Sequence, residues 1–269
     1  MTAVVRLLNV YPLKSAGGTR LMSAEVTPTG FRHDREFMLV RPDGARLSQR
    51  EVPRMALLRP SYDGGTLVVD APGAVAPLVH EGRTEGTPRE VRLPAGTCLG
   101  LDQGDEAAGW FGALLDVDCR LMRFTGRRET ARGGGTLTFA DGYPLLVISA
   151  ESLEDLNARL KSPLPMDRFR PNIVIEGLGP YGEDSVDLLR IGDMEIELVK
   201  PCGRCVITTT DQNSAVRGRE PLRTLATYRT RRTDDGSRAV IFGQNGIPRT
   251  VGTIRAGDRV CATTRRSHP

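Results

Sequence analysis

The sequence predicts a mainly β protein of the α+β class, in which two barrel-like units carry a few helices. The main observation is a series of short apolar segments closed at short intervals by glycine and proline, a pattern typical of strands joined by turns. Helical periodicity is confined to three segments, which do not alternate with the expected strands as in a doubly wound sheet. A chain of 269 residues can form one large domain or two of ordinary size.

The first part of the chain is expected to be rich in strands. The opening apolar segment 3–11 is expected to be a strand, and a hairpin is expected about the turn Pro42-Asp43-Gly44. Further strands are expected at residues 66–73, 89–101 and 119–124. A helix is expected over residues 104–116, because four large apolar side chains share one face: Trp110, Phe111, Leu114 and Leu115.

A segment rich in glycine and charge, residues 126–144, is expected to be an exposed loop near a boundary between two domains. We place the two domains at residues 1–122 and 123–269. Three consecutive glycines at 133–135 are not followed by Lys-Ser or Lys-Thr, so they indicate a flexible linker rather than a phosphate-binding loop.

The second half continues with strands and two short helices. Strands are expected at residues 144–148, 172–177, 194–198, 239–245 and 258–264. One helix is expected to begin near Ser149 or Ser152, with an apolar face formed by Leu153, Leu156 and Leu160. Another is expected to begin at Pro221, with inward side chains Leu222, Leu225 and Tyr228.

Composition favours a globular protein with a basic pocket for one anionic ligand. The net charge is +4, and among the 37 basic residues lysine occurs only at positions 14, 161 and 200. Aromatic residues make up 5% and the arginines are spread along the chain, so no nucleic-acid partner is expected. No stretch of 18 apolar residues occurs and the N-terminus resembles a strand, so neither a membrane span nor a secretory signal is expected. We therefore expect a cytoplasmic monomer with reduced cysteines.

The hexapeptide at residues 200–205, KPCGRC, is the segment in which chemistry is most expected. A zinc site or an iron–sulfur cluster would need further close cysteine or histidine pairs, and the chain has only this C-x-x-C. A redox disulfide would need a helix after the pair, whereas the β-branched run VITTT is expected to continue as a strand. Two buried structural cysteines remain an alternative. Lys200 and Arg204 flank the thiols and would stabilise a thiolate, the soft ligand that a polarisable metal prefers.

Three other loop-to-strand junctions carry groups that bind anions. They contain Lys14 with Ser15, the run from Arg32 to Arg35, and the group Arg168, Arg170 and Asn172. Arginine forks match phosphate and carboxylate geometry, and lysine and serine add single donors. Each residue taken alone could be an exposed loop charge or a surface ion pair. If the junctions converge on KPCGRC, they would form a basic pocket around a cysteine.

Eight segments along the chain carry a family resemblance: YPLKSAGG, GFRHDREFMLV, LSQREVPRMALL, FADGYPLLVIS, RFRPNIVIEG, KPCGRCVITT, EPLRTLATYR and FGQN. In this order they resemble the MOSC family, which is named after the C-terminal domain of molybdenum cofactor sulfurase. The chain is most similar to its bacterial and mitochondrial amidoxime-reducing members, from residue 3 to about residue 262. The resemblance implies an N-terminal β-barrel domain packed on a MOSC-type β-barrel with a few helices, and a bound molybdenum–pterin cofactor.

The resemblance also implies which residues hold the cofactor. The cysteine of the R-C-[IV]-x-T-T stretch, here Cys205, would ligate molybdenum, whereas Cys202 is not the expected ligand. Seven further residues are expected to bind the cofactor: Lys14, Ser15, Arg35, Asp141, Arg170, Asn172 and Arg204. Binding of the pyridoxal phosphate type is not expected.

The activity implied by the resemblance is reductive dehydroxylation of small N-hydroxylated compounds such as amidoximes, hydroxylamines and N-hydroxylated bases. The chain carries no ferredoxin-type cysteine array, so its electrons would come from separate partners of the ferredoxin, flavodoxin or flavoprotein reductase type. Two alternatives stay open. One is a carrier of the molybdenum cofactor or of sulfur as a Cys205 persulfide, and the other is a thiol oxidoreductase with a 202–205 disulfide.

Overall fold

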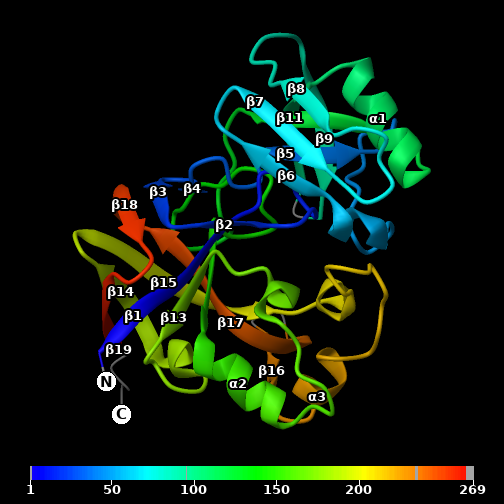
Figure 1. Cartoon of the computed structure of the whole chain (residues 1–269). Coiled ribbons are helices and arrows are strands. Elements are labelled where there is room, and N and C mark those ends of the chain that lie inside the picture. Colours follow the sequence, from blue (N-terminus) through cyan, green and yellow to red (C-terminus); the bar gives the residue numbers. More distant parts are fainter. Residues whose placement is uncertain (1, 95, 234–235, 265–269) are drawn as a thin grey trace.

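The computed structural model describes residues 2–94, 96–233 and 236–264. It confirms the predicted fold class, because strands dominate these residues and only three α-helices occur among them. The chain forms two β bodies (Figure 1). Strands from both ends of the chain make the lower body in this view, and strands from residues 37–125 make the upper one.

Seven strands of the lower body close into a barrel. Their order is β12 (Leu145–Ser149), β13 (Ile173–Glu176), β1 (Ala3–Val10), β19 (Arg259–Thr264), β14 (Val186–Ile191), β15 (Met194–Gly203) and β17 (Arg238–Pro248), and β17 pairs back with β12. The pair β12–β13 is parallel and the remaining neighbours are antiparallel. Two short strands extend this sheet, β2 (Thr19–Leu21) beside β1 and β16 (Thr230–Arg232) beside β17.

The barrel core follows from alternation of apolar residues along its strands. Met194, Ile196 and Leu198 of β15 are all buried, as the period of two predicts for a strand with one face on the core. Beyond Leu198 the pairing of β15 with β17 shifts register twice, between Leu198 and Lys200 and between Pro201 and Gly203. Such bulges bend a strand and redirect its side chains, so the end of β15 that carries KPCG turns away from the regular sheet.

The upper body consists of two antiparallel sheets and one helix. The first sheet has the order β5 (Phe37–Val40), β11 (Arg120–Thr125), β10 (Gly96–Asp102) and β9 (Pro88–Leu93), and the second has the order β6 (Arg59–Tyr62), β7 (Thr66–Asp70) and β8 (Leu78–Glu81). Helix α1 (Asp105–Leu115) buries Phe111 and Leu115, with Trp110 and Leu114 packed beside them. The apolar face predicted for residues 104–116 is therefore confirmed.

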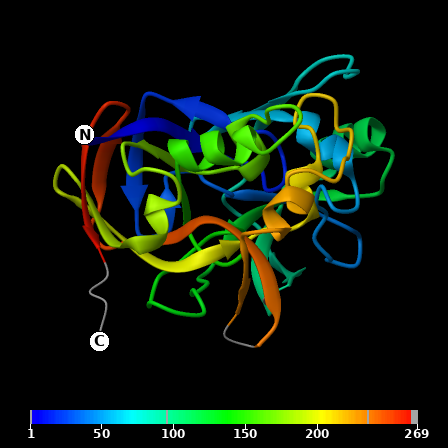
Figure 2. The ribbon, with the colours of Figure 1, turned by 90° about the horizontal axis from the view of Figure 1, so that it is seen from below.

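The remaining elements lie around the barrel. A small sheet of β18 (Gly252–Arg255), β3 (Ser23–Thr27) and β4 (Gly30–Phe31) joins the barrel core. Helices α2 (Ala150–Ala158) and α3 (Leu222–Ala226) lie on the side remote from the upper body, which Figure 2 shows from below. Four 3-10 helices complete the described structure: η1 (Pro53–Leu57), η2 (Met166–Phe169), η3 (Gly182–Ser185) and η4 (Val206–Thr209).

Strand β1 belongs to the barrel although it begins the chain. It pairs with β13 and with β19, which come from the second half of the sequence. The division that we placed between residues 122 and 123 stays a proposal.

The glycine-rich segment 126–144 is only partly the exposed loop that the sequence predicted. Leu137, Phe139 and Ala140 are buried, and the Phe139 ring lies edge-on to Phe124 with 5.2 Å between ring centroids. The prediction was wrong for these residues. It rested on the high glycine and charge content of the whole segment, whereas a short apolar stretch within it packs against the sheet of β5 and β11.

The run after Cys205 is not the strand that its β-branched residues predicted. Residues Val206–Thr209 form η4, and the hydroxyls of Thr208 and Thr209 donate to the carbonyls of Cys205 and Val206 at 2.9 and 2.8 Å. Threonine side chains that bond nearby carbonyls offer the backbone a local alternative to a sheet ladder. This local pairing overrides the strand propensity of the run.

A carboxyl group is buried where η3 meets α2. Glu183 is fully buried, and the Ser152 hydroxyl lies 2.9 and 3.0 Å from its two oxygens. Burial raises the pKa of Glu183 from 4.5 to about 7. The folded protein therefore binds this proton more tightly than the unfolded chain does. The stability that results is present in full below pH 4.5 and is lost as the pH rises through 7.

We expect Glu183→Gln to remove this pH dependence. Relative to the variant, the wild-type protein should lose up to about 3 kcal/mol of unfolding free energy between pH 5 and pH 8. Urea unfolding of both proteins across this range measures the difference, with exposed Glu154→Gln on α2 as the control. A stability difference between wild type and Glu183→Gln that stays constant with pH would contradict this expectation.

Candidate functional site

The eight residues predicted for the site all line one cavity of about 420 Å³. They come from five segments that reach the cavity from separate parts of the sequence: Lys14 and Ser15, Arg35, Asp141, Arg170 and Asn172, and Arg204 and Cys205. The upper body contributes Arg50 and Pro94. The structure thus brings the predicted residues together, while their roles stay predictions.

Three of these residues have unusual backbone conformations. Ser15, Arg35 and Arg170 have φ values of 65°, 49° and 57°, in the left-handed region that residues other than glycine rarely occupy. Such conformations cost free energy and persist only where the surrounding structure enforces them, often at ligand-binding sites. Their concentration around one cavity indicates that its shape is imposed by the fold rather than by local preference.

Lys14 and Asp141 form an ion pair at the cavity wall. The Lys14 ammonium lies 2.6 Å from Oδ1 of Asp141 and donates to the Phe139 carbonyl, also at 2.6 Å. The Lys14 charge lowers the pKa of Asp141 well below its ordinary range, whereas burial lowers the pKa of Lys14. Asp141 thus orients Lys14 and offsets part of the cost of burying its charge.

Arg35 and Asn172, which lie just before β5 and β13, form a second hydrogen-bond network. Arg35 Nη1 donates to Asp34 and to Oδ1 of Asn172, the latter at 3.0 Å. The Asn172 Oδ1 also accepts from the Leu146 amide at 3.2 Å. Asn172 therefore links the arginine to the edge of β12.

The two cysteines of KPCGRC each contact a different arginine. Arg50 Nη2 lies 3.3 Å from Sγ of Cys205, and Arg204 Nη1 lies 2.9 Å from Sγ of Cys202. Arg204 also donates to the Phe169 carbonyl at 2.6 Å. Each sulfur of the pair therefore lies beside a positively charged side chain.

Sequence reasoning missed Arg50, although it lies in the segment LSQREVPRMALL that contributed to the family resemblance. Its neighbours in the sequence do not indicate a site, because its contact is with Cys205, 155 positions later in the chain. The Arg50 loop is fixed by a buried amide pair in which Gln49 and Gln212 exchange hydrogen bonds of 3.1 Å. Arg217 adds donors to the carbonyls of Gln49 and Arg50.

Not every basic residue of the predicted junctions reaches the cavity. Arg32 pairs with Glu25 at the surface, His33 Nδ1 lies 2.9 Å from Glu36, and Arg168 pairs with Asp211 at 2.7 Å. The alternative of a surface ion pair is therefore confirmed for Arg32, whereas Arg168 is buried.

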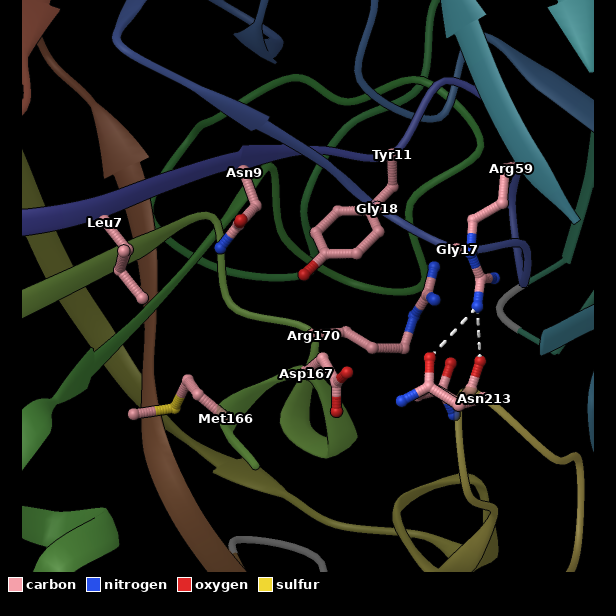
Figure 3. Close-up of a pocket in the computed structure, with 11 residues that line it drawn as sticks. Leu7, Asn9, Tyr11, Gly17, Gly18, Arg59, Met166, Asp167, Arg170 and Asn213 are labelled. Carbon is pink, nitrogen blue, oxygen red and sulfur yellow. Dashed lines mark hydrogen bonds between the residues drawn. The ribbon is translucent and has the colours of Figure 1, made fainter. Parts of the chain in front are cut away.

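A second cavity of about 210 Å³ also has Arg170 in its wall (Figure 3). Tyr11, Gly17, Asp167 and Asn213 contribute to its wall. Arg170 lines both cavities and therefore forms part of the partition between them.

Two further findings concern metals and membranes. Among the described residues, no three histidine, cysteine, aspartate or glutamate side chains come close enough to hold a metal ion by themselves. Cys205 could supply one ligand to a metal whose other ligands belong to a cofactor. None of the helices in the described ranges is long and apolar enough to cross a bilayer.

Comparison with known proteins identifies two families along the chain. Residues 2–118 match the MOSC N-terminal beta barrel domain, and residues 134–261 match the MOSC domain. The chain is 34% identical to mitochondrial amidoxime-reducing component 1 of Mus musculus and of Homo sapiens, covering 95% of this chain and 81% and 82% of the two relatives. It is also 34% identical to mitochondrial amidoxime reducing component 2 of Rattus norvegicus, over 93% of this chain and 80% of that protein.

These relatives correct one expectation and confirm another. The cytoplasmic location expected from the sequence is contradicted, because all three relatives are named as mitochondrial components. The family resemblance is confirmed by matches that extend over nearly the whole chain. The protein therefore belongs to the MOSC family, with a MOSC N-terminal β-barrel domain preceding its MOSC domain.

Proposed function

We propose that this protein binds a molybdenum–pterin cofactor through Cys205 and reduces small N-hydroxylated compounds with electrons from separate protein donors. The observation that carries the proposal is the convergence of a cysteine and an excess of positive charge in one cavity. Six basic residues line this cavity against the single acid Asp141: Lys14, Arg35, Arg50, Arg170, Lys200 and Arg204. An excess of cations around a thiol suits an anionic ligand that also bears a soft metal.

The residues present fit such a cofactor. Guanidinium and ammonium groups bind phosphate oxygens, and a thiolate is a ligand that a soft metal accepts. The buried Nε of Arg204 has no hydrogen-bond partner among the described residues. Since buried donors are normally paired, an unpaired one at the wall of a cavity is consistent with a site that a ligand completes.

The residues of the chain would hold the cofactor and shape the site. Cys205 would ligate the metal, Arg50 would orient its sulfur, and the cluster of Lys14, Arg35 and Arg170 would hold the phosphate. Bound molybdenum would supply the two-electron redox chemistry. In the overall reaction an N–O bond breaks, two electrons and two protons are taken up, and the N–H compound and water are formed.

The relatives support this class of reaction. Their names describe amidoxime-reducing components, and an amidoxime contains the N–OH group that the reaction removes. The electron donors would be separate proteins of the ferredoxin, flavodoxin or flavoprotein reductase type.

We expect Cys205→Ala to lower the molybdenum content per chain by about tenfold or more, because it removes the metal ligand. N-hydroxyl reduction should fall with it. Cys202→Ala is the matched control, three residues away in the same cavity, and should keep most of both. Elemental analysis, pterin fluorescence and reductase assays with a chemical electron donor measure these effects. Full activity of Cys205→Ala would refute the assignment, and a Cys205 persulfide without metal would favour the carrier alternative.

We expect Arg50→Met to lower the molybdenum content roughly tenfold, the effect of one lost hydrogen bond to a charged group. The reason is the 3.3 Å contact between its guanidinium and Cys205. Arg50→Lys should restore part of the content because it restores the charge. Arg54→Met is the control, since Arg54 is exposed and lies outside the cavity. If Arg50→Met were folded and fully loaded with molybdenum, Arg50 would not orient Cys205.

A further inference from the structure

The ring of Tyr11 lies against two of the arginines of the proposed site. The guanidinium carbons of Arg35 and Arg170 are each 4.3 Å from the centre of this ring. Tyr11 is buried, and its hydroxyl donates to the Pro171 carbonyl at 3.1 Å. Figure 3 shows the ring beside Arg170 at the wall of the smaller cavity. Neither the sequence motifs nor the family comparison assigns a role to this residue.

Arg35 is held by several contacts besides the ring. Its amide donates to the Tyr11 carbonyl at 2.7 Å, and its guanidinium donates to Asp34 and to Asn172. The position of Arg35 is therefore fixed by hydrogen bonds, and removing the Tyr11 ring would leave most of them in place.

Arg170 has fewer such contacts. Its side chain donates to the carbonyl of Ala16. Arg170 also lines both cavities. The ring of Tyr11 is thus one of two contacts that restrain this guanidinium, the other being the Ala16 carbonyl.

The charges in this cluster explain why a neutral ring is suited to the position. Burial and repulsion by the neighbouring Arg35 lower the pKa of Arg170 to about 10, so Arg170 stays charged at neutral pH. Burial raises the pKa of Tyr11 to about 12, so its ring stays neutral. The negative face of an aromatic ring attracts a guanidinium without neutralising it. A carboxylate at the same place would cancel charge that an anionic ligand needs.

We propose that Tyr11 is a positioning residue, whose ring holds the Arg170 guanidinium toward the larger cavity, where it binds the phosphate group of the cofactor. The inference rests on the proposed function for the identity of the ligand. It concerns phosphate binding, which can be measured without cofactor and without turnover. Tyr11 itself touches no reacting atom and acts through Arg170 and Arg35.

The test compares variants at position 11 in the full chain. Tyr11→Phe keeps the ring and removes the hydroxyl, and it should bind phosphate within about twofold of wild type. Tyr11→Leu should bind inorganic phosphate about tenfold more weakly, the effect of one well-buried cation–π contact. Calorimetry at low salt on protein from a host unable to make the pterin cofactor measures the binding. Molybdenum and pterin contents are measured on protein from a competent host and should fall in the same order.

Tyr181→Leu is the matched control. The Tyr181 ring lies 4.1 Å from the guanidinium carbon of Arg229, a similar pair that lies outside both cavities. This variant removes an equivalent contact elsewhere in the barrel and should leave phosphate affinity unchanged. Equal losses in Tyr181→Leu and Tyr11→Leu would show a general effect on folding and would overturn the proposal.

A second series keeps the size of the ring constant. Phenylalanine and pentafluorophenylalanine at position 11 have nearly the same shape, but fluorination removes the negative face of the ring. Phosphate affinity should therefore fall by about fivefold to tenfold on fluorination. Unchanged affinity in the fluorinated protein would overturn the proposal even if Tyr11→Leu failed to fold. Loss in Tyr11→Phe equal to that in Tyr11→Leu would also overturn it, since the hydroxyl and not the ring would then matter.

The results also separate this inference from the proposed function. Phosphate affinity that depends on the ring would support the inference, even if the wild-type protein retained no molybdenum. A wild-type protein without molybdenum would refute the proposed function but not the inference. Full molybdenum content together with phosphate affinity that is independent of the ring would refute the inference alone.

Discussion

The pairing of β12 with both β13 and β17 closes the barrel, and segments that flank its strands carry most of the predicted site residues. Segments next to β1, β13 and β15 line the larger cavity. Gly243 of β17 shows how close the approach is. A Cβ at this position would lie 2.8 Å from the Val147 carbonyl oxygen, and its φ is +81°. Only glycine meets both conditions, which explains why the FGQN segment has a glycine at position 243.

The cavity concentrates like charges, and the fold must hold them in place until a ligand binds. Six basic residues face one acid there, and three loop residues adopt left-handed backbone conformations. Different cations are restrained in different ways. Lys14 has an ion pair with Asp141, Arg35 has hydrogen bonds, and Arg170 has the face of an aromatic ring. These restraints leave an excess of positive charge, which is the physical requirement for binding an anion.

Contacts between the two bodies complete the site. The upper body supplies Arg50 to Cys205, and the amide pair of Gln49 with Gln212 fixes the loop that carries it. The barrel alone would lack the cation nearest the proposed metal ligand. Cys205 therefore depends on a residue about 150 positions earlier in the chain, and a MOSC domain without the upper body would present a different site.

The sequence by itself determined the fold class, the three helices, the core alternation of β15 and the family. Each of these rests on local periodicity or on contiguous motifs such as RFRPN and KPCGRC, which are visible without knowledge of the fold. It also supplied eight site residues, which the structure places around one cavity. The tertiary structure decided the rest. Strand β1 pairs with strands from the second half of the chain, Phe139 is buried, and VITT forms a 3-10 helix. Arg50 contacts Cys205, and Tyr11 contacts Arg170. These features depend on contacts between residues far apart in the chain, or on side-chain hydrogen bonds that compete with propensity, and a linear pattern encodes neither.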